Sequence, residues 1–193
     1  MKYEVLNHAC VRIEGEKTIY TDPFGLENAP HDADIIFITH DHYDHLSPED
    51  IEKVAKPETV LVMPKTVEYA SEWRSVKLQP EEKASVEGIA VEAVRAYNPN
   101  KKFHPKENDW LGFVITLDGI RFYVAGDTDD TPEARAVSCD VAFLPVGGTY
   151  TCTAEEAAEL AKAIAPAREA VPYHCGSIVG TKDDAVRFLS LIR

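Results

Sequence analysis

The chain has 193 residues, 45% of them hydrophobic, which is enough to bury a substantial core in one domain. Acidic residues outnumber basic residues by 33 to 20, giving a formal net charge of −13 and a pI of about 4.9. A surface this negative repels phosphate backbones and argues against a general nucleic-acid binder. Because no Gly/Ser-rich linker, low-complexity run or internal repeat divides the chain, we predict a single domain over residues 1–193.

The N-terminal segment and the cysteines bear on the cellular compartment. The first residues, MKYEVLNHACVRIEG, lack the long apolar stretch of a secretory signal, and no segment approaches membrane-spanning length. We therefore expect a cytoplasmic protein with no membrane partner. The four cysteines show no CxxC spacing, so free thiols are expected rather than disulfides.

The N-terminal third is predicted to begin with strands and to continue into a helix. Three stretches have the composition of an antiparallel meander: residues 3–6, 10–13 and 18–21. Residues 34–39 form a continuous apolar run, which is typical of a strand buried on both faces. Ser47 as N-cap and Pro48 at the first helical position then predict a helix that ends near Val54.

The middle of the chain alternates strands with less regular segments. Residues 59–63 are predicted to form a buried strand, and residues 64–73, which open with a proline, a helix. A strand, a turn at Glu87-Gly88 and a second strand follow. Residues 97–109 have no periodicity and many turn residues, and a loop of this length indicates a functional role.

The remainder of the chain predicts a hairpin followed by alternating helices and strands. Asp118-Gly119 is a strong turn signal between strands at 111–117 and 120–125. The later elements are a short helix, a strand, a helix with a capping box, a strand and a terminal helix, at residues 131–133, 141–146, 153–164, 170–173 and 181–191. This order predicts an α/β (α+β) fold of two face-to-face sheets with helices on both outer faces.

Four side chains that can bind metal lie within six residues, directly after the buried strand and directly before the capped helix: His40, His42, Asp44 and His45. Histidine is a common ligand of zinc, iron and other first-row ions. The His-x-His spacing lets two imidazoles project the same way, and the Asp-His pair can then point at a second ion. A solvated loop with surface histidines is the alternative, but chance places these residues together on the order of once in a thousand such chains.

Two further candidate ligands follow predicted strands far along the chain. Asp127 comes after residues 122–126, and His174 comes after residues 170–173. Sheet-based enzymes collect their catalytic groups at the C-terminal ends of strands, where the loops are free and the strands are rigid. The structural alternatives are a helix-capping or turn carboxylate for Asp127 and a hydrogen-bonded core histidine for His174.

These motifs together resemble the metallo-β-lactamase superfamily over essentially the whole chain. Asn7-His8-Ala9, Thr21-Asp22-Pro23 and Pro145-Val146-Gly147 resemble its small-hydrolase branch, which includes the L-ascorbate-6-phosphate lactonase and N-acyl-phosphatidylethanolamine phospholipase D types. The resemblance implies a four-layer αββα sandwich that holds two divalent metal ions, usually Zn²⁺ and in some members Mn²⁺ or Fe. It also implies the following ligands: His40 and His42 on the first ion, Asp44, His45 and His174 on the second, and Asp127 bridging both.

The sequence departs from the family pattern at one ligand. The family places a third histidine of the first site just after a strand, and that position is occupied here by Asn98. His104, six residues later, is the only histidine between His45 and Asp127. Either the 97–109 loop folds back so that His104 binds the first ion, or the first site is poorer and its ion is held weakly.

Three more residues receive roles from their place in the sequence. By resemblance, Asp22 would accept a hydrogen bond from a ligand imidazole and fix its tautomer; the alternative is a turn carboxylate before Pro23. His8 is expected near the pocket, where it contacts the substrate or a metal ligand, or else makes a structural hydrogen bond. His31 is expected on the surface.

The resemblance implies hydrolysis of a small ester, lactone or phosphoester. Two ions a little under ~4 Å apart can share one hydroxide, because bound water loses its proton near neutral pH. Asp44 and Asp127 would balance the charge of the ions and orient this nucleophile. The sequence has no Gly-x-Ser-x-Gly motif, so a serine mechanism is unnecessary.

The partner is expected to be a small molecule. The lysines of the 97–109 loop, with Phe103 and Trp110, could recognise a small anionic substrate; the alternative is a solvated loop anchored by the tryptophan. Two other functions are kept as alternatives: a phosphodiesterase or nuclease of the same fold, and a metal-binding homologue without turnover. The oligomeric state is left open.

Overall fold

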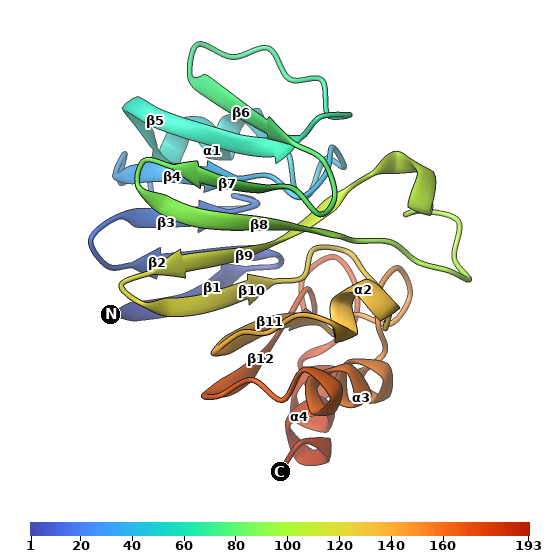
Figure 1. Cartoon of the computed structure of the whole chain (residues 1–193). Helices are drawn as coiled ribbons and strands as arrows, with labels where there is room; N and C mark the ends of the chain where they lie inside the picture. Colours follow the sequence, from blue (N-terminus) through green and yellow to red (C-terminus); the bar gives the residue numbers. More distant parts are fainter.

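The structure, a computed structural model, describes all of residues 1–193 and contains two six-stranded sheets (Figure 1). The first sheet has the order β1-β2-β3-β4-β5-β6. Its strands are Lys2–Asn7, Cys10–Glu14, Thr18–Thr21, Ala33–Phe37, Ala55–Pro64 and Arg74–Leu78. The β1–β3 strands pair antiparallel, as predicted, and β3 to β6 pair parallel.

The second sheet has the order β12-β11-β10-β9-β8-β7. Its strands, in chain order from β7, are Lys83–Val86, Ile89–Arg95, Leu111–Leu117, Ile120–Val124, Val141–Pro145 and Glu169–Tyr173. The predicted turn at Asp118 and Gly119 joins β9 to β10, with both residues at positive φ (49° and 76°). A two-residue turn with this backbone matches the twist of the strands, which fixes the register of the hairpin.

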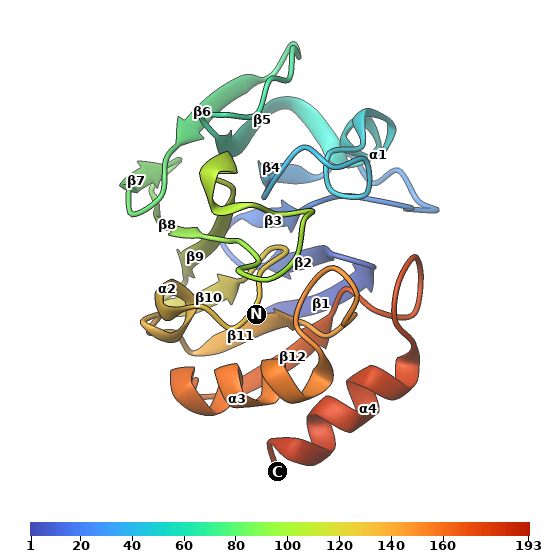
Figure 2. The same ribbon diagram turned by 90° about the vertical axis from the view of Figure 1, so that its right-hand side faces the viewer.

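Helices cover both outer faces of the pair of sheets. They are α1 (Pro48–Val54), α2 (Pro132–Arg135), α3 (Ala154–Ile164) and α4 (Lys182–Leu191), with a 3-10 turn, η1, at Lys106–Asn108. Figure 2 shows α3 and α4 beside β11 and β12, with α1 on the opposite side of the molecule. Three apolar clusters fill the layers: one between the sheets, one beneath α2 to α4 and one beneath α1. The predicted αββα sandwich is therefore confirmed.

Residues 64–73 do not form the predicted helix. The strand β5 continues to Pro64, and an irregular segment then leads to β6, which pairs parallel with β5. Because β6 runs in the same direction, the connection must return along the length of β5, and a helix over ten residues would leave none for its turns. Val67 is fully buried in the cluster beneath α1 and anchors this crossing.

The topology brings separate parts of the chain to one edge of the sandwich. The parallel strands β4, β10 and β12 all end at this edge, and the β1–β2 turn and the end of β8 lie there too. Figure 2 looks onto this edge, where the loops at 97–109, 146–153 and 174–181 gather. None of the helices has the length and apolarity that a bilayer crossing requires.

Candidate metal centre

Three histidines form what we call the first ligand group: His40, His42 and His104. One ring nitrogen of each lies within 4.8 Å of the others, and His40 Nε2 is 3.1 Å from His42 Nδ1. His40 and His104 are buried, whereas His42 is partly exposed. The ring of Trp110 packs against His40 and His42, with ring centroids 4.7 and 4.8 Å away, and so limits the orientations of both imidazoles.

The second ligand group consists of Asp44, His45 and His174, with His8 beside it. One nitrogen or carboxylate oxygen from each of these four residues lies within 4.8 Å of the others. The Nε2 atoms of His45 and His174 are 3.3 Å apart. His174 has positive φ (56°), a backbone conformation that turns the chain sharply after β12 and directs its ring inward.

Asp127 lies between the two groups, on the turn after β10. Its Oδ2 atom is 3.2 Å from Nε2 of His104 and 3.1 Å from Nε2 of His174. Its Oδ1 atom is 3.3 Å from Nε2 of His45. One carboxylate thus reaches nitrogens of both groups, which is the arrangement of a bridging ligand.

The donor atoms fit divalent metal ions. His104 Nε2 and Asp127 Oδ1 are buried, and their contacts of 3.2 and 3.3 Å within the cluster lack the angles of a hydrogen bond, a state that costs about 1–3 kcal/mol for each group. Ring nitrogens also face one another within each group, and such a cluster of lone pairs is stabilised when a cation lies among them. Imidazole and carboxylate are the donors that zinc, iron and manganese accept.

Asp22 holds one ligand imidazole in a defined tautomer. Its carboxylate is fully buried and accepts hydrogen bonds from Thr39 N (2.8 Å) and from Thr39 Oγ1 (2.7 Å). Its Oδ2 atom is also 2.8 Å from Nδ1 of His45. A proton held on Nδ1 would leave the Nε2 lone pair of His45 for a metal, which is the role that the resemblance predicts for Asp22.

Asn98 supports His104 instead of taking its place. The 97–109 loop folds back, so that the backbone N–H of Asn98 donates to the carbonyl of His104 at 2.8 Å. The Asn98 Oδ1 atom lies 2.5 Å from His104 Nδ1 and accepts a hydrogen bond from it. The loop therefore folds back as one of the two alternatives requires, and His104 lies beside His40 and His42, where it could bind the first ion.

His8 contacts the second ligand group from the β1–β2 turn. Its Nε2 atom is 3.1 Å from Asp44 Oδ2, and its carbonyl accepts a hydrogen bond from the backbone of His174 at 2.9 Å. His8 is buried and does not line the cavity, so it contacts ligand residues and is not placed to contact a substrate. His31 is exposed, as expected.

The electrostatics of the cluster couple its carboxylates and imidazoles. Burial alone would lower the pKa of His45, but Asp127 and Asp22 outweigh it and raise that pKa well above its usual value. Burial and the charge of His45 lower the pKa of His40 well below its usual value. Burial opposes ionisation of Asp127, yet the charges of His174 and His45 hold its pKa well below the ordinary range. Asp127 is therefore ionised at neutral pH.

A cavity of about 270 Å³ opens over the two ligand groups. Five residues of the cluster line it, together with five from the surrounding loops: Tyr43, Phe103, Tyr150, Ile178 and Val179. No lysine of the 97–109 loop lines this cavity. Lys101 pairs with Asp129 and Lys106 with Glu133, so the loop is pinned to its neighbours.

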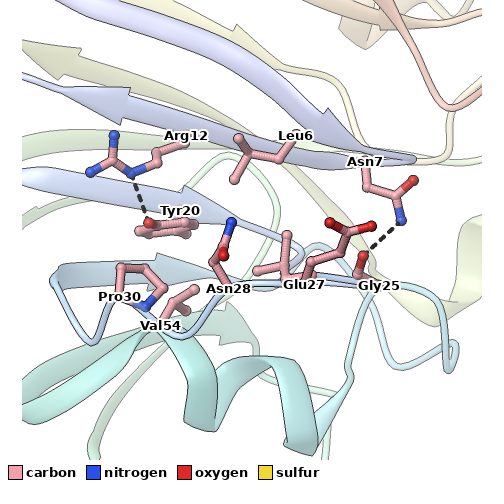
Figure 3. Close-up of a pocket in the computed structure, with 10 residues that line it drawn as sticks. Leu6, Asn7, Arg12, Tyr20, Gly25, Glu27, Asn28, Pro30 and Val54 are labelled. Carbon is pink, nitrogen blue, oxygen red and sulfur yellow. Dashed lines mark hydrogen bonds between the residues drawn. The ribbon is translucent and has the colours of Figure 1, made fainter.

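A second hollow of about 440 Å³ lies on the outer face of β1 to β3 (Figure 3). It shares no residue with the ligand groups. Arg12, the cation that lines it, donates to the phenolic oxygen of Tyr20 at 2.7 Å and pairs with Asp32. Asn7 donates to the backbone at Phe24. No cluster of metal-binding side chains lies in this hollow, so we assign the chemistry to the smaller cavity.

Comparison with known proteins identifies the family. A profile of the β-lactamase superfamily domain matches residues 2–174. A UPF0173 metal-dependent hydrolase of Thermoplasma acidophilum is 31% identical, over 95% of this chain and 87% of the relative. The crystal structure of a candidate metal-dependent hydrolase from Parabacteroides distasonis matches with a TM-score of 0.82 and 28% identity, covering 99% of this chain and 87% of that one. A candidate Zn-dependent hydrolase of the metallo-β-lactamase superfamily from Thermotoga maritima matches with a TM-score of 0.66 and 27% identity, covering 98% and 84%. The chain belongs to the metallo-β-lactamase superfamily and, within it, to the UPF0173 family of metal-dependent hydrolases.

Proposed function

We propose that this protein hydrolyses a small ester, lactone or phosphoester with two zinc ions. The observation that carries the proposal is the position of Asp127, whose carboxylate reaches His104, His174 and His45 at 3.1–3.3 Å. Zinc is favoured over manganese because imidazoles dominate the donor set, and the similarity to a Zn-dependent hydrolase supports the same choice.

The first ligand group would hold one ion and the second ligand group the other, with Asp127 shared between them. When bound, the ions would acidify a water molecule and polarise the substrate oxygen. Asp22 and Asn98 would act on the ligands, since each holds the far nitrogen of one imidazole. These contacts fix the ring orientations before any ligand arrives, which is what a pre-organised site requires.

We assign to Asp44 the role of accepting the proton that the attacking water loses. Its side chain is 14% exposed and lines the cavity, whereas the side chain of Asp127 is only 4% exposed. Burial opposes ionisation of Asp44, but the hydrogen bond from His8 and the charge of His45 lower its pKa below the usual value. Asp44 is thus ionised at neutral pH and can accept the proton of an attacking water.

The other candidate functions are less well supported. A nuclease needs cationic side chains along the path of its substrate, and no lysine or arginine lines the cavity. The hypothesis of a metal-binding protein without turnover came from the asparagine at position 98, where the family has a histidine. It is less well supported because His104 lies beside His40 and His42. Hydrolysis with two ions therefore remains the function that the geometry supports best.

The test combines metal analysis with a hydrolase panel. We expect about two ions per chain, and turnover of generic esters, lactones or phosphoesters that Asp44→Ala abolishes. Asp41→Ala is the matched control: Asp41 lies in the same loop, but it is exposed and belongs to neither ligand group, so its removal should leave activity unchanged. One tightly bound ion with no turnover on any substrate would contradict the proposal.

A further inference from the structure

The mouth of the metal cavity exposes large apolar side chains. Seven large hydrophobic residues are exposed in the whole chain, and three of them line this one cavity: Tyr43, Phe103 and Ile178. Their exposed fractions are 68%, 54% and 42%. Single exposed apolar residues are ordinary, but a cluster around a functional cavity marks a binding surface.

The three residues come from three different loops, and a fourth packs against one of them. Phe103 and Tyr150 meet edge to face with ring centroids 4.8 Å apart, and Val179 lies beside Ile178 in the wall. An edge-to-face aromatic pair is held by its ring quadrupoles, so this part of the wall exists before a ligand binds. The apolar wall continues directly from the ligand groups, because the same cavity is lined by His42, His104 and His174.

Charged side chains are absent from the wall outside the ligand groups. Two of the lysines in the 97–109 loop are engaged elsewhere: Lys101 donates to the carbonyl of Thr151 as well as to Asp129, and Lys106 pairs with Glu133. Lys102 is exposed and does not line the cavity. Arg95 pairs with Asp109. A phosphate or carboxylate on a part of the substrate remote from the reacting atom would thus lie against aromatic and aliphatic groups, and no cation lines this wall to balance its charge.

We infer that this cavity binds an uncharged carbonyl substrate, an ester or lactone, whose apolar acyl group lies against Phe103, Tyr150 and Ile178. This inference rests on the proposed function and narrows its substrate class. The acyl chain is bonded to the reacting carbon, as is the alcohol oxygen that leaves, so it must begin next to the ligand groups, where the apolar wall begins. The cavity volume of about 270 Å³ lies near the lower end of small-molecule sites, which limits the substrate to a small molecule.

Binding of hydroxamic acids to the zinc-loaded protein distinguishes the contribution of the acyl group to affinity from that of the metal-binding group. Acetohydroxamic acid carries the metal-binding group alone, pentanoyl hydroxamic acid adds an apolar chain, and succinic monohydroxamic acid adds a carboxylate at similar length. Dissociation constants are measured by calorimetry. Since burying a methylene favours binding and this wall is partly open, we expect the pentanoyl compound to bind about tenfold more tightly than the acetyl compound. The succinic compound should bind at least about tenfold more weakly than the pentanoyl compound.

Variants of the wall test which residues are responsible. The ratio of the acetyl to the pentanoyl dissociation constant should fall about two- to fourfold in Phe103→Ala and in Ile178→Ala. Phe103→Leu should keep most of this ratio. The affinity for acetohydroxamic acid and the zinc content should stay unchanged, which shows that the neighbouring His104 is undisturbed. Val186→Ala is the matched control, because Val186 is exposed on α4 and lies outside this cavity.

The outcomes distinguish failure of the apolar acyl site from failure of the proposed metal site. If acetohydroxamic acid binds but the pentanoyl chain adds nothing, or the succinic compound binds equally well, the apolar acyl site is refuted and the metal site stands. If acetohydroxamic acid fails to bind the protein after zinc loading, the proposed metal site fails, and the acyl site fails with it.

Discussion

Replacing Asn98 by alanine tests whether this residue positions the third histidine of the first ligand group. Asn98 is 3% exposed and His104 is 1% exposed, so their contact is shielded from bulk solvent. The substitution removes the acceptor 2.5 Å from His104 Nδ1 and leaves the backbone hydrogen bond between the two residues in place. The loop should therefore keep its course while the imidazole loses its orientation.

The expected magnitude follows from the kind of contact that is lost. Removing a partner that orients a metal-ligating histidine costs 10- to 100-fold in metal affinity, or roughly 1.4–2.7 kcal/mol. The effect should fall on one ion only, because Asn98 contacts no member of the second ligand group. His104→Ala removes the ligand itself and should weaken the same ion further. Asn98→Asp keeps an acceptor oxygen and should retain most of the affinity.

Competition titration with a chromophoric chelator measures both binding steps in each variant. We expect one weakened step and one unchanged step for Asn98→Ala. Titration curves for Asn98→Ala and His104→Ala that superimpose on those of the unmodified protein would refute the assignment of His104 as a ligand and of Asn98 as its support.

Three further predictions follow from the same structure. Removing metal with EDTA should lower the melting temperature in calorimetry and zinc should restore it, since ions that bind only the folded chain stabilise it. Asp22→Asn should weaken the ion at the second ligand group and lower the free energy of unfolding by about 1–3 kcal/mol in urea, because the buried Nδ1 of His45 loses its charged partner. Asp50→Ala should destabilise the chain by roughly 2 kcal/mol at neutral pH, since Asp50 accepts hydrogen bonds from the backbone of Gly25 and Leu26. Against the effect of burial, these bonds hold the pKa of Asp50 below its usual value, so the stabilisation is complete above about pH 4 and is lost as pH falls through the folded value. Urea unfolding at pH 7 and pH 3 should therefore differ less in the variant than in the unmodified chain, and an equal difference would contradict the prediction.

Local signals in the sequence were sufficient to predict most of the fold. The capping box at Thr153 and Glu156 and the N-cap at Ser47 lie at the observed helix starts, because caps satisfy backbone groups within a few residues. The predicted helix over residues 64–73 was wrong because its course depends on where β6 must lie beside β5. That constraint comes from a strand pairing between distant residues, which no local propensity encodes.

The residues of the candidate site likewise differ in how well local sequence predicts them. The cluster from His40 to His45 is contiguous and could be found from spacing alone. The position of His104 depends on the path of a loop without periodicity, so the sequence could only name it as one of two alternatives. The pairing of Lys101 with Asp129 and of Lys106 with Glu133 joins residues 27 or more positions apart, and for this reason the sequence left open whether these lysines contact an anionic substrate or lie in a solvated loop.

The most direct test of the whole account is a crystal structure of the zinc-loaded protein with anomalous diffraction recorded at the zinc edge. We predict two anomalous peaks. One should lie among the ring nitrogens of His40, His42 and His104, and the other beside His45 and His174, with the carboxylate of Asp127 reaching both. A single peak, or peaks remote from Asp127, would contradict a shared two-ion centre.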